Sequence, residues 1–214
     1  MFANLYPSVV IARIIVLVIS FSIHEFAHAW TANAFGDDTP RLNGRLTLNP
    51  ASHLDLVGTL MLIVAGFGWA RPVPVDPYAL RRRSPAALMW VSLAGPASNL
   101  AMAVLCAVPF RLGLFDNMPY WNDMLPTLPQ LFLQMIVINL TLMLFNLIPL
   151  APLDGEKVLD FLLPPQMARG FEAIRPYGPM ILMAMLFLLP AIGIDLIGMV
   201  MTPVMNTLTG LLLM

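Results

Sequence analysis

Long stretches of apolar residues, separated by shorter polar segments, dominate the chain. They fall at about residues 8–33, 54–69, 86–110, 128–150 and 177–214. A transmembrane helix needs about 20 consecutive apolar residues, and all but the second stretch are long enough. Strands of a membrane barrel would instead alternate apolar and polar residues over segments of about 10 residues. The pattern therefore predicts an all-α polytopic membrane protein with about five or six membrane helices.

The second stretch is too short to cross a bilayer comfortably. It has fifteen residues between Asp55 and Arg71, and it contains Gly58, Gly66 and Gly68. We expect a short re-entrant element here, because irregular backbone is tolerated at membrane depth where protein or water covers it. Turn residues flank short alternating pieces in RLNGRLTLNP and WARPVPVDP, which predicts a small β-element beside it.

The last stretch, 177–214, is interrupted by Pro190, Asp195 and Pro203. It is compatible with one broken span or with a hairpin of two, and the residues alone leave both open. The length and the absence of a long polar region indicate a single membrane-embedded domain over 1–214.

The composition agrees with a membrane protein. The chain is 59 % hydrophobic and 11 % charged, with a mean hydropathy of +0.81. A soluble domain has about 45–50 % apolar and about 25 % charged residues. The net charge of −1 gives no basic surface for nucleic acid, so no nucleic-acid partner is expected. A single cysteine, Cys106, excludes an intrachain disulfide and any Cys-based zinc site.

Basic residues are concentrated in alternate polar segments. If the short second stretch does not cross, segments 34–53 and 70–85 lie on one side of the membrane. Their basic residues are Arg41, Arg45, Arg71, Arg81, Arg82 and Arg83. Segment 111–127 on the other side has only Arg111, and 151–176 returns to the basic side. Because cytoplasmic loops carry the excess of Lys and Arg, the first helix is expected to run toward the cytoplasm.

Three ionisable residues stand at the end of the first apolar stretch, in SIHEFAHAW. His24 and His28 are four residues apart and share one face of a helix, so both imidazoles can bind one zinc ion. Glu25 is then close enough to contact a metal-bound water molecule without being a metal ligand itself. The alternative is a pair of interfacial histidines. Ionisable residues are costly within a span and are usually functional there, which favours a metal site.

A catalytic zinc site has three protein ligands and an open position. The remaining histidine is His53. The acids in or near membrane segments are Asp55, Asp154, Glu156 and Asp195. Asp154 is favoured because Pro149 and Pro152 break the end of the fourth stretch, at the same predicted depth as the histidines. Considered alone, Asp154 would be interpreted as a helix cap after a proline turn.

Three motifs in this order resemble the site-2 protease family of intramembrane zinc metalloproteases. They are HEFAH at 24–28, GPASN at 95–99 and NLIPLAPLDG at 146–155. A fourth stretch, LNPASHLDLVGT at 48–59, is similar to the short branch of that family without a peptide-binding PDZ domain. The C-terminal tail is not covered by the resemblance.

The resemblance implies one zinc ion per chain, held by His24, His28 and Asp154, with Glu25 as the general base. It also implies that Asn146 helps to bind the substrate backbone or the oxyanion. The catalytic core would then cover about residues 8–160, followed by one or two C-terminal membrane segments.

Two further polar residues have open roles. His53 could donate to an oxyanion or orient a ligand, and the alternative is an interfacial histidine. Asn99 could line the cleft or make a structural hydrogen bond. The small residues Gly95, Ala97 and Ser98 before it predict a close approach of two helices.

The expected activity is hydrolysis of a peptide bond within or near a transmembrane helix of a membrane-protein substrate. Such a helix must unwind locally, so cuts near Gly, Pro or Asn are expected. The alternative is a non-catalytic protein, either a zinc carrier or an inactive homologue acting as a chaperone. All histidines lie between His24 and His53 with an acid in the base position, which favours one catalytic site.

The expected location is the plasma membrane of a prokaryote, with the active site toward the cytoplasm. The expected partners are the lipid bilayer and a substrate helix. An exposed helix face would be the same against lipid or a second copy, so the sequence is also compatible with a homo-oligomer.

Overall fold

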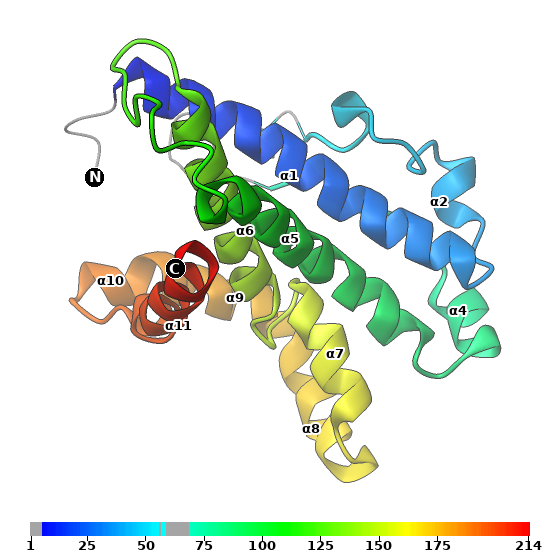
Figure 1. Ribbon diagram of the computed structural model, residues 1–214. Coiled ribbons are helices and arrows are strands. Elements are labelled where there is room, and N and C mark those ends of the chain that lie inside the picture. Colours follow the sequence, from blue (N-terminus) through cyan, green and yellow to red (C-terminus); the bar gives the residue numbers. More distant parts are fainter. Residues whose placement is uncertain (1–5, 56, 59–68) are drawn as a thin grey trace.

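A computed structural model of the chain describes residues 6–55, 57–58 and 69–214 (Figure 1). Its first half contains α1 (Pro7–Ala34), α2 (Thr39–Leu42), η1 (Pro50–Ser52), α4 (Pro77–Arg83) and α5 (Ala87–Arg111). Its second half contains α6 (Leu128–Asn146), α7 (Asp154–Leu162), α8 (Pro165–Ile174), η2 (Arg175–Tyr177), α9 (Gly178–Met183), the π-helical turn η3 (Ala184–Leu188), α10 (Leu189–Ala191) and α11 (Leu196–Leu213). The predicted all-α fold is confirmed.

The described residues contain no β-strand. The only extended pairing among them is an isolated antiparallel bridge between Leu54 and Ala70, at the two ends of the expected inserted stretch. Most of that stretch, residues 56 and 59–68, lies outside the described residues.

Five helices of the described chain are long and apolar enough to cross a membrane. They are α1, α5, α6, the nearly continuous helix Pro165–Ala191 and α11. The number agrees with the sequence prediction. The C-terminal stretch 177–214, which the sequence left open, contains the second part of Pro165–Ala191 and all of α11, separated by a turn in which Gly193 has a φ of +86°. The chain is thus a multi-pass membrane protein.

The helices α1, α5 and α6 pack against one another and form the core. Ala103 and Ala107 of α5 are buried against Ile136, Leu140 and Met143 of α6. Small residues let membrane helices approach closely, and van der Waals contact then stabilises the pair. The helix α11 packs on the outside of this cluster and has no buried residue.

Polar contacts fasten one end of this core. The backbone N–H of Ser8 donates to the carbonyl of Asp123 over 3.1 Å, and the Gln130 amide donates to the Ser8 hydroxyl over 3.2 Å. Thr127 and Gln130 cap the start of α6 reciprocally. The start of α1 is therefore held beside the start of α6, and α2 and α4 lie toward the opposite end of α1 (Figure 1).

The helix α7 begins directly after the proline-rich turn that follows α6. A Cβ atom at Gly155 would lie 2.3 Å from the Leu147 carbonyl oxygen, so only glycine allows this turn to fold back on α6. Arg175 donates to Glu156 over 2.5 Å and to Asp160 over 3.1 Å. These ion pairs fix α7 to the start of the C-terminal hairpin and thereby fix the position of its first residue.

Candidate metal centre

Residues from two distant parts of the chain meet at one point inside the bundle. The Nε2 atoms of His24 and His28 in α1 are 3.0 Å apart, and each is 3.3 Å from Oδ2 of Asp154 at the start of α7. Their ligand atoms all lie within 4.8 Å of one another. The histidines are buried, and the carboxylate is 14 % exposed.

Hydrogen bonds determine which imidazole nitrogens face this point. The Nδ1–H of His28 donates to the Val91 carbonyl over 2.6 Å, and the Nδ1–H of His24 donates to the amide oxygen of Asn99 over 2.6 Å. Each neutral ring then directs the lone pair of its Nε2 toward Asp154. Two lone pairs and a carboxylate directed at one buried point repel one another unless a proton or a metal cation lies between them, so the donor set fits a metal ion.

The bond to His24 is part of a buried polar chain across the three core helices. The Asn99 amide donates to Asn139 over 2.8 Å, and the Asn139 amide donates to the Ser20 hydroxyl over 2.9 Å. All three side chains are buried. Such partners fix the ring orientation of a metal-binding histidine.

Gly95 allows α5 to pass directly against the two imidazoles. A Cβ at this position would lie 2.5 Å from Cε1 of His24 and 2.5 Å from Nε2 of His28. The predicted close helix approach at GPASN is therefore confirmed at Gly95. Of the two roles considered for Asn99, the structure shows a buried hydrogen bond, made to a histidine of the cluster.

Glu25 is buried beside the cluster and contacts the segment that begins at residue 69. Its Oε2 accepts a hydrogen bond from the backbone N–H of Val73 over 3.2 Å. Burial lowers the pKa of the nearby Arg45, the positive charge of Arg71 lowers it further, and the negative charge of Glu25 raises it. Glu25 is thus held by a backbone amide and lies within the field of a buried arginine.

The ionised form of Asp154 is favoured. Burial acts to raise its pKa, but positive charge on His28 and His24 and hydrogen bonds from both rings outweigh burial and hold the pKa of this carboxyl below its ordinary value. A metal cation between the three side chains would supply that positive charge and leave both rings neutral. An anionic oxygen with two neutral imidazoles is a ligand set of catalytic zinc sites, which leave the fourth position open.

Comparison with known proteins gives the family. The chain is 44 % identical over 181 residues to the "Putative zinc metalloprotease YwhC" of Bacillus subtilis, covering 83 % of this chain and 80 % of the relative. It is 33 % identical over 193 residues to the "Putative zinc metalloprotease Rip2" of Mycobacterium tuberculosis (strain ATCC 25618 / H37Rv), covering 88 % and 71 %. The chain belongs to this zinc metalloprotease family. No family model and no solved structure matches it.

The other acids considered as zinc ligands have different partners in this metalloprotease. Asp195 caps α11 by accepting from the Gly198 N–H over 2.8 Å. Glu156 pairs with Arg175. Of the acids weighed from the sequence, Asp154 is the one that shares the three-residue cluster with the histidines in the described structure.

Two predicted catalytic residues are outside this cluster. His53 is fully buried, and its Nε2 lies 2.7 Å from the Thr47 carbonyl. Its Nδ1 has no hydrogen-bond partner among the described residues. Asn146 is half-buried at the end of α6, and its amide donates to Leu142 over 3.0 Å. Their roles in catalysis stay predictions.

Some contacts of the site have no signal in the sequence. The Val73 amide and the Val91 carbonyl are backbone groups that any residue could supply, and only the fold brings them to Glu25 and His28. Asn139 lies outside the sequence motifs and was not predicted as a site residue. A polar residue in the middle of an apolar helix was the signal that could have identified it.

Proposed function

We propose that the protein is a zinc-dependent intramembrane endopeptidase that hydrolyses a peptide bond within or near a transmembrane helix of a membrane-protein substrate. The observation that carries this proposal is the cluster of His24, His28 and Asp154 beside Glu25, in a helix apolar enough to span a membrane. A structural histidine pair would not need an acid in the base position.

His24, His28 and Asp154 would hold the zinc ion. When bound, zinc polarises the scissile carbonyl and lowers the pKa of a water molecule. Glu25 accepts the proton of the attacking water and then returns it to the leaving amine. The hydrogen bond from the Val73 N–H holds this carboxylate beside the cluster.

Asn146 and His53 are proposed as hydrogen-bond donors to the oxyanion that forms during hydrolysis. The Nε2–H of His53 donates to the Thr47 carbonyl, so its buried Nδ1, which has no partner among the described residues, accepts in the neutral ring and can donate to an oxyanion only when the ring is protonated. Asn146 is half-buried at the end of α6, which is compatible with a contact to the substrate backbone.

The proposed substrate is a membrane helix that unwinds locally at the site, with cuts favoured near Gly, Pro or Asn. The excess of arginine between α1 and α5 supports a location toward the cytoplasmic side of the plasma membrane. Water would enter from that side, because the bilayer interior supplies none.

The proposal is tested by measuring zinc content and cleavage of a model transmembrane substrate in vesicles, for the wild type and Glu25→Gln. We expect both proteins to bind about one zinc ion per chain and cleavage to fall by about 10²–10⁴-fold in the variant. Glu172→Gln, which neutralises an exposed acid, is the matched control and should retain both properties. Full cleavage by Glu25→Gln would refute the assignment, and zinc transport into vesicles without cleavage would favour a carrier.

A further inference from the structure

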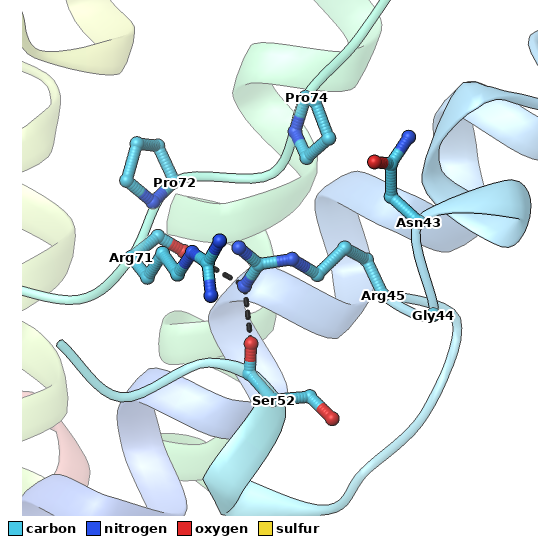
Figure 2. Close-up of a pocket in the computed structure, with 7 residues that line it drawn as sticks. All are labelled: Asn43, Gly44, Arg45, Ser52, Arg71, Pro72 and Pro74. Atoms are coloured by element: carbon cyan, nitrogen blue, oxygen red, sulfur yellow. Dashed lines mark hydrogen bonds between the residues drawn. The ribbon is translucent and has the colours of Figure 1, made fainter.

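A cavity of about 550 Å³ lies between the segment after α2 and the segment before α4. It is lined by Asn43, Gly44, Arg45, Ser52, Arg71, Pro72 and Pro74 (Figure 2). The catalytic proposal above uses none of these side chains.

Two arginines give the cavity its charge. Arg45 is 5 % exposed, and its Nη1 donates to the carbonyls of Ser52 and Arg71, the latter over 3.4 Å. The side chain of Arg71 is exposed, and Figure 2 shows its guanidinium beside that of Arg45. Neither guanidinium has a carboxylate oxygen within 4.0 Å among the described residues.

This arrangement leaves the positive charge of the cavity without a carboxylate at contact distance among the described residues. A buried charge needs a counter-charge or several strong hydrogen bonds, and the two carbonyls satisfy only one nitrogen of Arg45. The guanidinium of Arg71 adds a second positive charge, and the negative charge of Glu25 acts on Arg45 from beyond ion-pair distance. Guanidinium groups bind planar carboxylates through two parallel N–H···O bonds, so the cavity fits a carboxylate.

The cavity adjoins the backbone segment that binds the proposed general base, Glu25. Val73 lies between the two lining residues Pro72 and Pro74, and its N–H donates to Oε2 of Glu25 over 3.2 Å. A substrate backbone beside Glu25 therefore passes close to the cavity. Each residue of an extended chain advances about 3.3 Å, so a side chain a few residues from the cut can reach it.

We propose that the Arg45–Arg71 cavity is a substrate subsite that binds the carboxylate of an acidic side chain located a few residues from the scissile bond. The inference rests on the proposed function, because it assigns a specificity to the same active site. A lipid phosphate would be held by the same donors. The substrate carboxylate is favoured because the cavity adjoins the segment that holds Glu25.

The test uses the full chain in phosphatidylcholine vesicles, which carry no net charge, with model substrates that bear one Glu, Gln or Lys at successive positions beside the cut. We expect Glu to raise kcat/KM over Gln by about tenfold at one or two positions. This preference should be lost in Arg71→Gln and change toward Lys in Arg71→Glu. Arg82→Gln removes an exposed arginine of α4 outside the cavity and should keep the preference for Glu.

Equal Glu-to-Gln ratios in the wild type and Arg71→Gln would overturn the inference. A dependence on Arg71 that is seen only when phosphatidylglycerol is added would overturn it too and identify a lipid phosphate as the ligand. Photo-crosslinking of the same substrates to Glu25→Gln measures the preference without cleavage. If the wild type does not cleave the substrates but crosslinking still favours Glu, the proposed protease activity is refuted and the proposed subsite is not.

Discussion

The helices α5 and α11 have nearly the same mean hydropathy, and both are long enough to cross a membrane, but they differ in what they bury. In their most apolar windows of 18 residues, 44 % of the residues of α5 are buried and none of those of α11. Hydropathy measures how well a helix partitions into lipid and does not measure packing. The small and polar residues of α5, Gly95 and Asn99 above all, identify the helix that supports the metal cluster.

The largest difference is expected between Asp154 of the metal cluster, which α5 supports, and Asp195, the cap of α11. Asp154→Ala removes the anionic ligand and leaves two imidazoles, so zinc affinity should fall by at least about 100-fold and cleavage should stop. Asp195→Ala removes only the cap of α11 and should cost about 1 kcal/mol of stability with zinc retained. Zinc affinity, measured by competition with a chelator, checks both variants, and an unchanged affinity in Asp154→Ala would exclude it as a ligand.

Asp154 also shows how much of the metal cluster can be predicted from the sequence. The four-residue spacing of His24 and His28 fixes their common helix face by geometry alone, so this half of the cluster is predictable. Asp154 required an argument about chain reversal at prolines, because 125 residues separate it from the pair (154 − 28 − 1). The hydrogen bond from the Val73 amide to Glu25 could not be predicted, because any residue except proline supplies the same backbone N–H.

The C-terminal region was less predictable for a related reason. Pro190 indicates a break, but a proline kinks one helix or ends it depending on its neighbours. The turn is made at Gly193, whose positive φ is accessible to glycine at little cost. The all-α class and the five candidate spans follow from apolar run length, which is why they could be predicted without knowledge of packing.

A matched pair of glycines gives the next largest effect. Gly95→Ala places a methyl group 2.5 Å from both imidazoles, which must move apart, so we expect zinc binding to weaken by at least about tenfold. Gly210→Ala in α11 meets only the flexible Met214 side chain at 3.8 Å and should stabilise the helix slightly. Zinc stoichiometry and thermal unfolding in detergent measure both. Normal zinc binding in Gly95→Ala would show that the helices can separate without cost.

The smallest effect is expected for the hydrogen bond behind His24. Asn99→Ala removes the acceptor that orients this ring, and zinc affinity should fall by about tenfold. Asn99→Asp keeps an acceptor for the His24 N–H but loses the donor to Asn139, so its zinc affinity should lie between those of Asn99→Ala and the wild type. Thr207→Val removes an exposed hydroxyl of α11 that only donates within its own helix and should leave zinc affinity unchanged.

A comparison of Asn99→Ala with Asn139→Ala separates orientation of the His24 ring from packing of the bundle. Asn139→Ala breaks the same polar chain one step further from the metal site and leaves the bond between Asn99 and His24 in place. If the chain serves only to fill the bundle, Asn139→Ala and Asn99→Ala should lower zinc affinity equally. If it orients the ligand, Asn139→Ala should lower stability by about 1–3 kcal/mol with a smaller loss of zinc affinity, because the ring itself remains held.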